Sequence, residues 1–151
     1  MYKRIILAVD LAESVSTPKG LPQALELSKA GGGELRLVNV QAVIPATFME
    51  YVPVDFDEEQ EKRAKAELDA ILAGVDLPAE RKSAATRAGG IYHELLEEAS
   101  EWRADLIVVG HQRRASLAAR WWRNSMGASL IEYAPCSVLI AMEAKSGVVS
   151  Q

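Results

Sequence analysis

The side chains best suited to chemistry gather in one stretch near the end of the chain, and their types favour anion binding. Gly110 ends a short apolar run, and His111 and Arg113 follow it in a polar loop. Asn124 and Ser125 come later, and their amide and hydroxyl groups can cap a helix and donate to phosphate. A helix start offers free N–H groups and the positive end of a dipole. Arginine is a good bidentate partner for the same anion.

The elements on either side of this stretch decide where its polar groups would lie. Leu106–Val109 is continuously apolar and predicts a buried strand, and Cys136–Met142 predicts a second one. Between them, Arg120–Tyr133 carries apolar residues at the spacing of one helix face. Strand, loop, helix and strand form the building block of parallel sheets, whose ligands bind beyond the carboxyl ends of the strands. The loop after Gly110 is expected at that position.

The first strand brings a carboxylate to the same edge. Tyr2–Asp10 is predicted to be a strand, and the continuous apolar run Ile5–Val9 is typical of a strand that is covered on both faces. Asp10 stands at its tip and would face the same cleft as Gly110 if the two strands were parallel neighbours. An aspartate after a strand is also common as a turn or cap residue, so both roles stay open here.

The rest of the chain alternates between helical and strand patterns. Helices are expected from Pro18 to about residue 30, with Ser16 or Thr17 as N-cap, at 57–74 and at 91–103. Strands are expected at 34–40 and 81–88, and the second of these, poor in large apolar residues, suits a sheet edge. The many charges of 57–74 favour a solvated helix surface. This alternation predicts an α/β domain with an open five-stranded parallel sheet and helices on both faces.

Composition excludes several classes of function. The chain has 151 residues, enough for one domain, which we place at 1–143 with a tail at 144–151. Its net charge of -4 disfavours a nucleic-acid partner. No apolar run reaches the roughly 18–20 residues that span a bilayer, so no membrane partner is expected. Cys136 is the one cysteine and is expected to be a small buried hydrophobe. Because the sequence shows no secretory leader, we expect a cytoplasmic protein.

The pattern VVGHQRR…RNS…APCSVLIA resembles the C-terminal signature of the universal stress protein family. In that family Gly, two residues, Gly, nine residues and Gly, followed by Ser, Thr or Asn, cradle nucleotide phosphates. Here Gly110 is the first glycine and Arg113 replaces the second. The loop is one residue longer, and Asn124 replaces the third glycine before Ser125. The resemblance covers nearly the whole chain.

The resemblance implies a Rossmann-like sheet, of the kind found in the adenine nucleotide alpha hydrolases, with strand order 3-2-1-4-5. It implies a stress-response or regulatory role in which ATP or AMP is bound, with Mg²⁺ on the triphosphate beside Asp10. It also implies a homodimer through the last strand, Cys136–Met142. The site residues carried over from the family's pattern are Ala8, Val9, Asp10, Val40, Val109, Gly110, His111, Arg113, Asn124, Ser125 and Met126.

Two other kinds of protein compete with a nucleotide binder. One is a dimeric interaction protein of the same family that does not bind nucleotide, which the two missing glycines favour. The other is a flavodoxin-like enzyme or a phospho-acceptor domain, although only Asp10 stands where a phospho-acceptor would cluster acids. The sequence contains no recognisable catalytic constellation. At most, the resemblance leaves room for a slow ATPase.

Overall fold

The computed structural model describes residues 1–11, 17–42, 50–51, 55–110 and 127–142. Five parallel strands form one sheet in the order β3-β2-β1-β4-β5. This arrangement confirms the predicted fold class and strand order. The strands are β1 (Arg4–Ala8), β2 (Glu34–Gln41), β3 (Lys82–Ala88), β4 (Leu106–Gly110) and β5 (Ser137–Ala141). The helices are α1 (Leu21–Gly31), α2 (Phe56–Ala73), the short 3-10 helix η2 (Ala79–Arg81), α3 (Ile91–Trp102) and α5 (Gly127–Tyr133).

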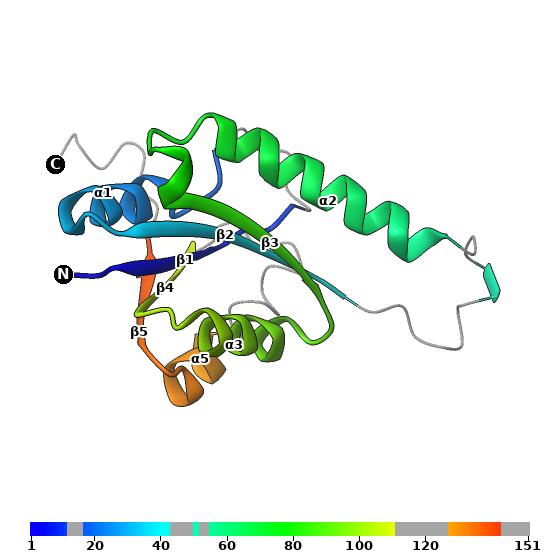
Figure 1. Cartoon of the computed structure of the whole chain (residues 1–151). Helices are drawn as coiled ribbons and strands as arrows, with labels where there is room; N and C mark the ends of the chain where they lie inside the picture. The colour runs from blue at the N-terminus through cyan, green and yellow to red at the C-terminus, as the bar shows by residue number, and fades with distance from the viewer. Residues whose placement is uncertain (12–16, 43–49, 52–54, 111–126, 143–151) are drawn as a thin grey trace, which may run out of the picture.

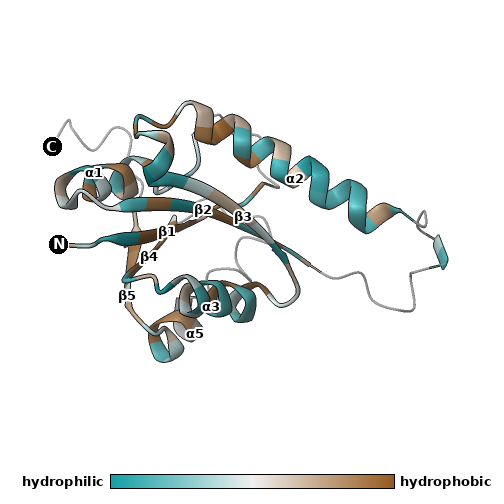
Figure 2. Ribbon diagram, viewed as in Figure 1, coloured by the Kyte–Doolittle hydropathy of each residue, from teal (hydrophilic) through white to brown (hydrophobic). Residues whose placement is uncertain are grey.

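Helices cover the sheet on both faces, as Figure 1 shows. On one face, Leu7 of β1 and Leu37 of β2 belong to a buried cluster that includes Ala24 of α1 and Leu68 of α2. On the other face, alternate strand residues meet α3 and α5 in a second cluster. Because neighbouring strand residues point to opposite faces, a strand buried on both sides must be apolar throughout. Figure 2 shows this apolar character in the inner strands and the mixed polar surface of α2.

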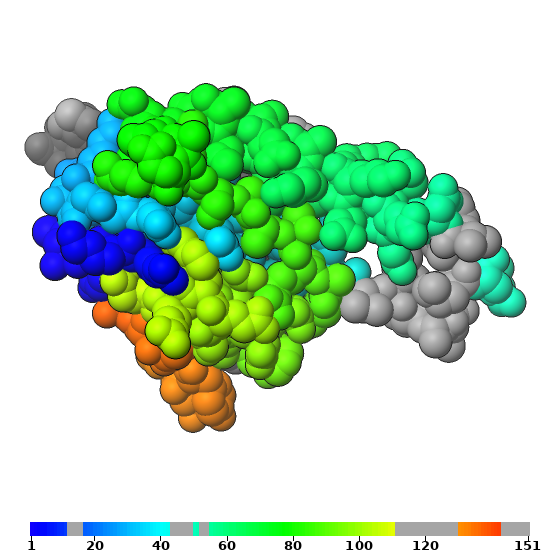
Figure 3. All heavy atoms as spheres, in the orientation of Figure 1, coloured from blue at the N-terminus to red at the C-terminus, as the bar shows by residue number. Residues whose placement is uncertain are grey.

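The register of the inner strands places their carboxyl ends at one edge. Ala8 of β1 lies opposite Val38 of β2 and Val109 of β4. Residue 10 follows β1, and residue 110 ends the neighbouring parallel strand β4, so both lie at the same end of the sheet, as predicted. The first turns of α2 extend past this edge, and the space-filling view shows them projecting from the body of the molecule (Figures 1 and 3).

The prediction for the start of α1 was wrong by one turn. The helix begins at Leu21, and its N-cap is Gly20 in the left-handed region at φ 88°, in place of the predicted Ser16 or Thr17. The backbone N–H of Leu21 donates to Pro18 O at 3.1 Å, so Pro18 belongs to a turn that precedes the helix. Pro22 falls in the first turn, where its missing N–H costs no helical hydrogen bond. The predicted stop at the glycines is confirmed, because the helix ends at Gly31.

An ion cluster fastens α3 to the edge of the sheet at β3. Arg87 of β3 contacts Glu94 at 2.9 Å, Glu98 at 3.0 Å and Glu101 at 3.1 Å, all from α3. Burial opposes the charge of Arg87, but these three carboxylates outweigh it and raise the pKa of the guanidinium above its ordinary value. Arg36 of β2 adds a contact of 2.7 Å to Glu98, which is 6% exposed. Both arginines are therefore structural.

The last strand was predicted to be buried over Cys136–Met142, but β5 spans Ser137–Ala141 and only Ala141 in it is buried. β5 forms the other edge of the sheet, next to β4. Cys136 precedes it and is only partly buried, at the margin of the second cluster. The expectation of a buried cysteine was wrong because an edge position leaves one flank of the chain without a neighbouring strand. Among the described helices, none has the length and apolar character needed to cross a bilayer.

Candidate functional site

The pairing of β1 with β2 continues beyond the end of β1 and fixes the position of Asp10. The backbone N–H of Val9 donates to Val38 O at 2.8 Å. The side chain of Asn39, 6% exposed, donates through Nδ2 to Val9 O at 2.8 Å. Because both groups of Val9 are bonded to β2, the next residue leaves the sheet at a defined point. Asp10 is exposed there, just beyond the carboxyl ends of the strands.

A cavity of about 380 Å³ opens beside Asp10, between the ends of β1 and β2 and the helix α2. Ligand pockets generally measure about 300–1,000 Å³, so this cavity has the size of a small-molecule site. Its position at the carboxyl edge is where ligands bind in open parallel sheets. The lining residues are Asp10, Leu11, Asn39, Val40, Gln41, Gln60, Arg63, Ala64 and Glu67.

One face of α2 forms a wall of this cavity. Gln60, Arg63, Ala64 and Glu67 lie three or four positions apart and so share one side of the helix. Ala64 is 2% exposed, and its small side chain leaves room between the helix and the strand ends. The sequence indicated these charges as a solvated helix surface. Helical spacing does not reveal which polar stripe faces a cavity, because that depends on how the helix packs.

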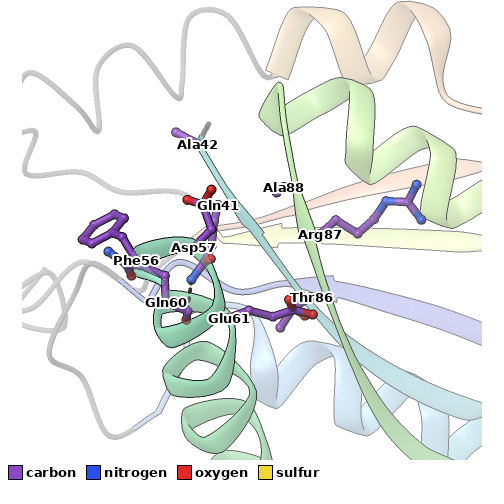
Figure 4. Close-up of a pocket in the computed structure, with 9 residues that line it drawn as sticks. All are labelled: Gln41, Ala42, Phe56, Asp57, Gln60, Glu61, Thr86, Arg87 and Ala88. Carbon is purple, nitrogen blue, oxygen red and sulfur yellow. Dashed lines mark hydrogen bonds between the residues drawn. The ribbon is translucent and has the colours of Figure 1, made fainter. Parts of the chain in front are cut away.

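A second, smaller cavity of about 230 Å³ lies farther along the same edge, at the ends of β2 and β3 (Figure 4). Gln41 and Gln60 line both cavities, and Gln41 Nε2 donates to Gln60 O at 3.0 Å. Arg87 also lines the second cavity, but its side chain extends away from the α2 residues (Figure 4). Because the Arg87 guanidinium is bound to three carboxylates of α3, it does not offer its charge to a ligand in the smaller cavity.

The structure divides the predicted site residues into four groups, one of which is Gly110 at the end of β4. Asp10 and Val40 line the larger cavity. Ala8, Val9 and Val109 are buried in the sheet, where their side chains pack in the two clusters. The remaining predicted residues after Gly110, namely His111, Arg113, Asn124, Ser125 and Met126, lie outside the residues that the structure describes.

Gly110 ends β4 at the same edge as Asp10, and its neighbours explain why it is glycine. A Cβ atom at this position would lie 2.7 Å from the carbonyl oxygen of Lys19 and 2.8 Å from its carbonyl carbon. Such distances are too short for any side chain, and the obstacle is backbone, which cannot move aside cheaply. The backbone of Lys19 packs so closely against position 110 that only glycine fits there, independently of any role in ligand binding.

Metal binding at Asp10 would depend on groups that a ligand brings. Among the described residues, no three His, Cys, Asp or Glu side chains gather closely enough to hold a metal ion. Asp10 and Glu67 are the carboxylates that line the larger cavity. A carboxylate suits Mg²⁺, but this ion generally takes only one or two carboxylates and completes its shell with water and substrate phosphates.

Solved structures share the fold over nearly the whole chain. The universal stress protein UspA from Lactobacillus plantarum superposes with a TM-score of 0.71 at 19% identity, over 93% of this chain and 97% of that one. A universal stress protein in complex with cAMP gives 0.55 at 24% identity, over 93% and 96%. The Archaeoglobus fulgidus universal stress protein in complex with dAMP gives 0.55 at 16% identity, over 92% and 97%. At these identities the likeness shows a common fold.

Sequence comparison adds the family. Universal stress protein A homolog 1 of Coxiella burnetii is 29% identical over 142 residues, which cover 91% of this chain and 94% of that protein. The homolog of Haemophilus ducreyi is 28% identical over 118 residues, or 75% and 79% of the two chains. The pattern that describes the universal stress protein family matches residues 1–141. Because that match extends over nearly the full length, the chain belongs to the universal stress protein family.

Proposed function

We propose that this protein binds an adenine nucleotide, ATP or AMP, at the carboxyl edge of its sheet, in a stress-response or regulatory role. The observation that carries the proposal is the cavity of about 380 Å³ lined by Asp10 and Val40. Its size suits a small molecule, and its place beyond the strand ends suits a nucleotide. Two proteins of the same fold that are known in complex with cAMP and dAMP support the choice of an adenine nucleotide.

In this proposal each part of the nucleotide meets a suitable group. The base and ribose occupy the cavity, where the Asp10 carboxylate accepts hydrogen bonds from ribose hydroxyls and the Val40 backbone meets the base. The phosphates point toward Gly110 and the residues after it, with Arg113, Asn124 and Ser125 as donors. ATP would bring Mg²⁺ on its phosphates, and Asp10 would offer that ion a carboxylate oxygen.

Calorimetric titration of ATP, AMP and cAMP into the wild-type protein tests the proposal. We expect saturable binding of at least one of them, and at least a tenfold loss of affinity in Asp10→Ala, since about 1.4 kcal/mol corresponds to a factor of ten. Asp69→Ala serves as the control, because Asp69 is an exposed acid of α2 that does not line the cavity. Flat titrations at millimolar nucleotide would remove the proposal and leave an interaction protein as the better account.

The edge at β5 supports a second proposal, a homodimer through the last strand. β5 has one neighbouring strand in the sheet that the structure describes, and Ile140 and Met142 are 38% and 47% exposed. Ile131 and Tyr133 of α5 are 69% and 64% exposed. An apolar edge strand is a liability that a closed two-fold contact would cover. This surface also fits the alternative of a dimeric interaction protein without nucleotide.

Sedimentation equilibrium of the wild-type protein and of Ile140→Lys tests this second proposal. A charge on the edge should convert a dimer into a monomer without unfolding it. The control Ala66→Lys, at an exposed position of α2, would show whether a lysine added elsewhere on the surface has the same result. A monomeric wild-type protein would contradict the dimer and leave nucleotide binding untouched. The proposed single domain at 1–143, its tail and a cytoplasmic location complete this account.

A further inference from the structure

Two charged residues on the cavity wall form no polar contact with the described residues, whereas the two lysines of the same helix each lie close to an acid. Lys62 lies 3.9 Å from Glu59, and Lys65 lies 3.7 Å from Asp69. Within the described part of the chain, by contrast, Arg63 and Glu67 form neither a hydrogen bond nor an ion pair, although opposite charges four residues apart commonly pair on a helix. Both line the cavity. The stripe of α2 that faces the cavity therefore presents a donor and an acceptor to whatever enters.

The donor and acceptor are spaced to meet two atoms of one purine. Residues four apart on a helix have Cβ atoms about 5–6 Å from each other. Arg63 offers only N–H donors, and ionised Glu67 offers only acceptors. One edge of adenine carries the opposite pair, the N7 acceptor next to the N6 amino donor. Ala64 lies between them in sequence and leaves the space that a flat ring requires.

We propose that α2 selects the base of the nucleotide, with Arg63 donating to adenine N7 and Glu67 accepting from the N6 amino group. This inference rests on the proposed function and goes beyond it, because it assigns base selection to a helix. Guanine keeps N7 but replaces the amino group with the O6 acceptor. With guanine, the Glu67 carboxylate and the O6 atom would both be acceptors and could not form a hydrogen bond. Glu67 therefore discriminates against guanine. Asp10 lines the same cavity at the end of β1, where the proposed function places the ribose.

The contact between Glu67 and the N6 amino group is tested by calorimetric titration of AMP and GMP into wild type, Glu67→Met and Glu58→Met. Methionine keeps the length of the side chain and removes the acceptor, and Glu58 is an exposed α2 acid that does not line the cavity. We expect wild type and Glu58→Met to prefer AMP by about tenfold, which corresponds to one charged hydrogen bond. In Glu67→Met the preference should fall to near one. An unchanged preference overturns the assignment of Glu67.

The contact between Arg63 and adenine N7 is tested with 7-deaza-AMP, in which a C–H group replaces N7. Wild type and the control Lys62→Met should bind 7-deaza-AMP about tenfold more weakly than AMP, because the Arg63 hydrogen bond is lost. In Arg63→Met the two ligands should bind equally well. If Arg63→Met still loses affinity for the deaza compound, Arg63 does not contact N7. Thermal unfolding of each variant checks that the helix is intact.

The outcomes also separate the two levels of the proposal. A wild-type protein that binds none of the nucleotides overturns the proposed function and the base selection together. A wild-type protein that binds AMP and GMP equally well, or variants that leave the ratios unchanged, overturns base selection alone. Weaker binding of both AMP and GMP in Asp10→Ala, with the AMP to GMP affinity ratio conserved, would support the division of the cavity into a ribose side and a base side.

Discussion

The two edges of the sheet treat their polar side chains in opposite ways. At the amino edge, where the strands begin, charged side chains are bonded to the backbone. Asp105 accepts from Lys3 N at 2.8 Å through Oδ2 and from Arg4 N at 3.0 Å through Oδ1. Arg81 donates to Gly33 O at 2.9 Å and to Ser28 O at 3.0 Å. These charges close the ends of elements that would otherwise leave backbone groups unpaired.

At the carboxyl edge, charged side chains surround a cavity. Asp10, Arg63 and Glu67 line a space of about 380 Å³. Only the buried Asn39 among the polar residues there is bonded to the backbone of a neighbouring strand, as far as the described residues show. The difference indicates that polar residues at the first edge hold the sheet together, while Arg63 and Glu67 at the second edge face a cavity. The same chemical groups thus stabilise the backbone at one edge and line a cavity at the other.

The largest expected effect is at the amino edge, in Gly33→Ala. A Cβ there would lie 2.8 Å from the carbonyl oxygens of Tyr2 and Lys3. Because this obstacle is backbone, we expect a loss of about 3 kcal/mol in the free energy of unfolding. Urea denaturation measures it. The matched control is Gly74→Ala, where a Cβ would meet only the Ile71 oxygen at 3.5 Å, and a similar loss in both variants would contradict the explanation.

The next effect compares two aspartates at opposite edges. Asp105→Ala leaves the N–H groups of Lys3 and Arg4 without their acceptor, and should lower the free energy of unfolding by about 2 kcal/mol. Asp10→Ala should lower it by only about 0.5 kcal/mol, because Asp10 is exposed, yet it should impair nucleotide binding. Denaturation and calorimetry on both variants check this. If the losses of stability were reversed, the contrast between the edges would be wrong.

A third prediction concerns the space beside α2. Leucine in place of Ala64 would fill part of the cavity, so affinity for AMP should fall at least tenfold, about 1.4 kcal/mol. Stability should change by less than about 1 kcal/mol, since the added atoms enter free space. The control is Ala66→Leu, at an exposed position of the same helix. Wild-type affinity in Ala64→Leu would show that the ligand binds elsewhere.

The smallest effect is on the thiol that precedes β5 at the amino edge. Burial, followed by the negative charge of Asp105, raises the pKa of Cys136. A raised pKa means less thiolate at pH 8, so iodoacetamide should react more slowly than with a free thiol. The midpoint of the pH–rate profile should lie above the ordinary value and should move down in Asp105→Asn. A midpoint at the ordinary value would contradict this, whatever the absolute rate.

The fold followed from the sequence because its signals are local. Continuous apolar runs such as Ile5–Val9 mark strands covered on both faces, and their alternation with helices specifies a parallel sheet. The start of α1 was misplaced because Gly20 adopts a left-handed conformation that interrupts a plausible helix at Pro18. Boundaries depend on single backbone angles, which periodicity does not report.

The candidate site was predictable only where the chain itself leads to the edge. Asp10 and Val40 follow strands, so the position of strand ends placed them. Arg63 and Glu67 were missed, because a helix rich in charges gives no sign of which stripe faces inward. The glycine at position 110 was assigned to phosphate binding, but the backbone of Lys19 alone requires it. One residue type therefore fitted two explanations that only packing separates.

The most direct test of the account is an AMP titration followed by two-dimensional NMR of backbone amides. The account predicts shifts concentrated at Asp10, Leu11, Val40 and Gln41 and along residues 60–67 of α2. Amides at the amino edge, including Lys3, Arg4 and Asp105, should keep their positions. Shifts confined to the amino edge, or none at saturating AMP, would contradict the claim that the carboxyl edge is the binding edge.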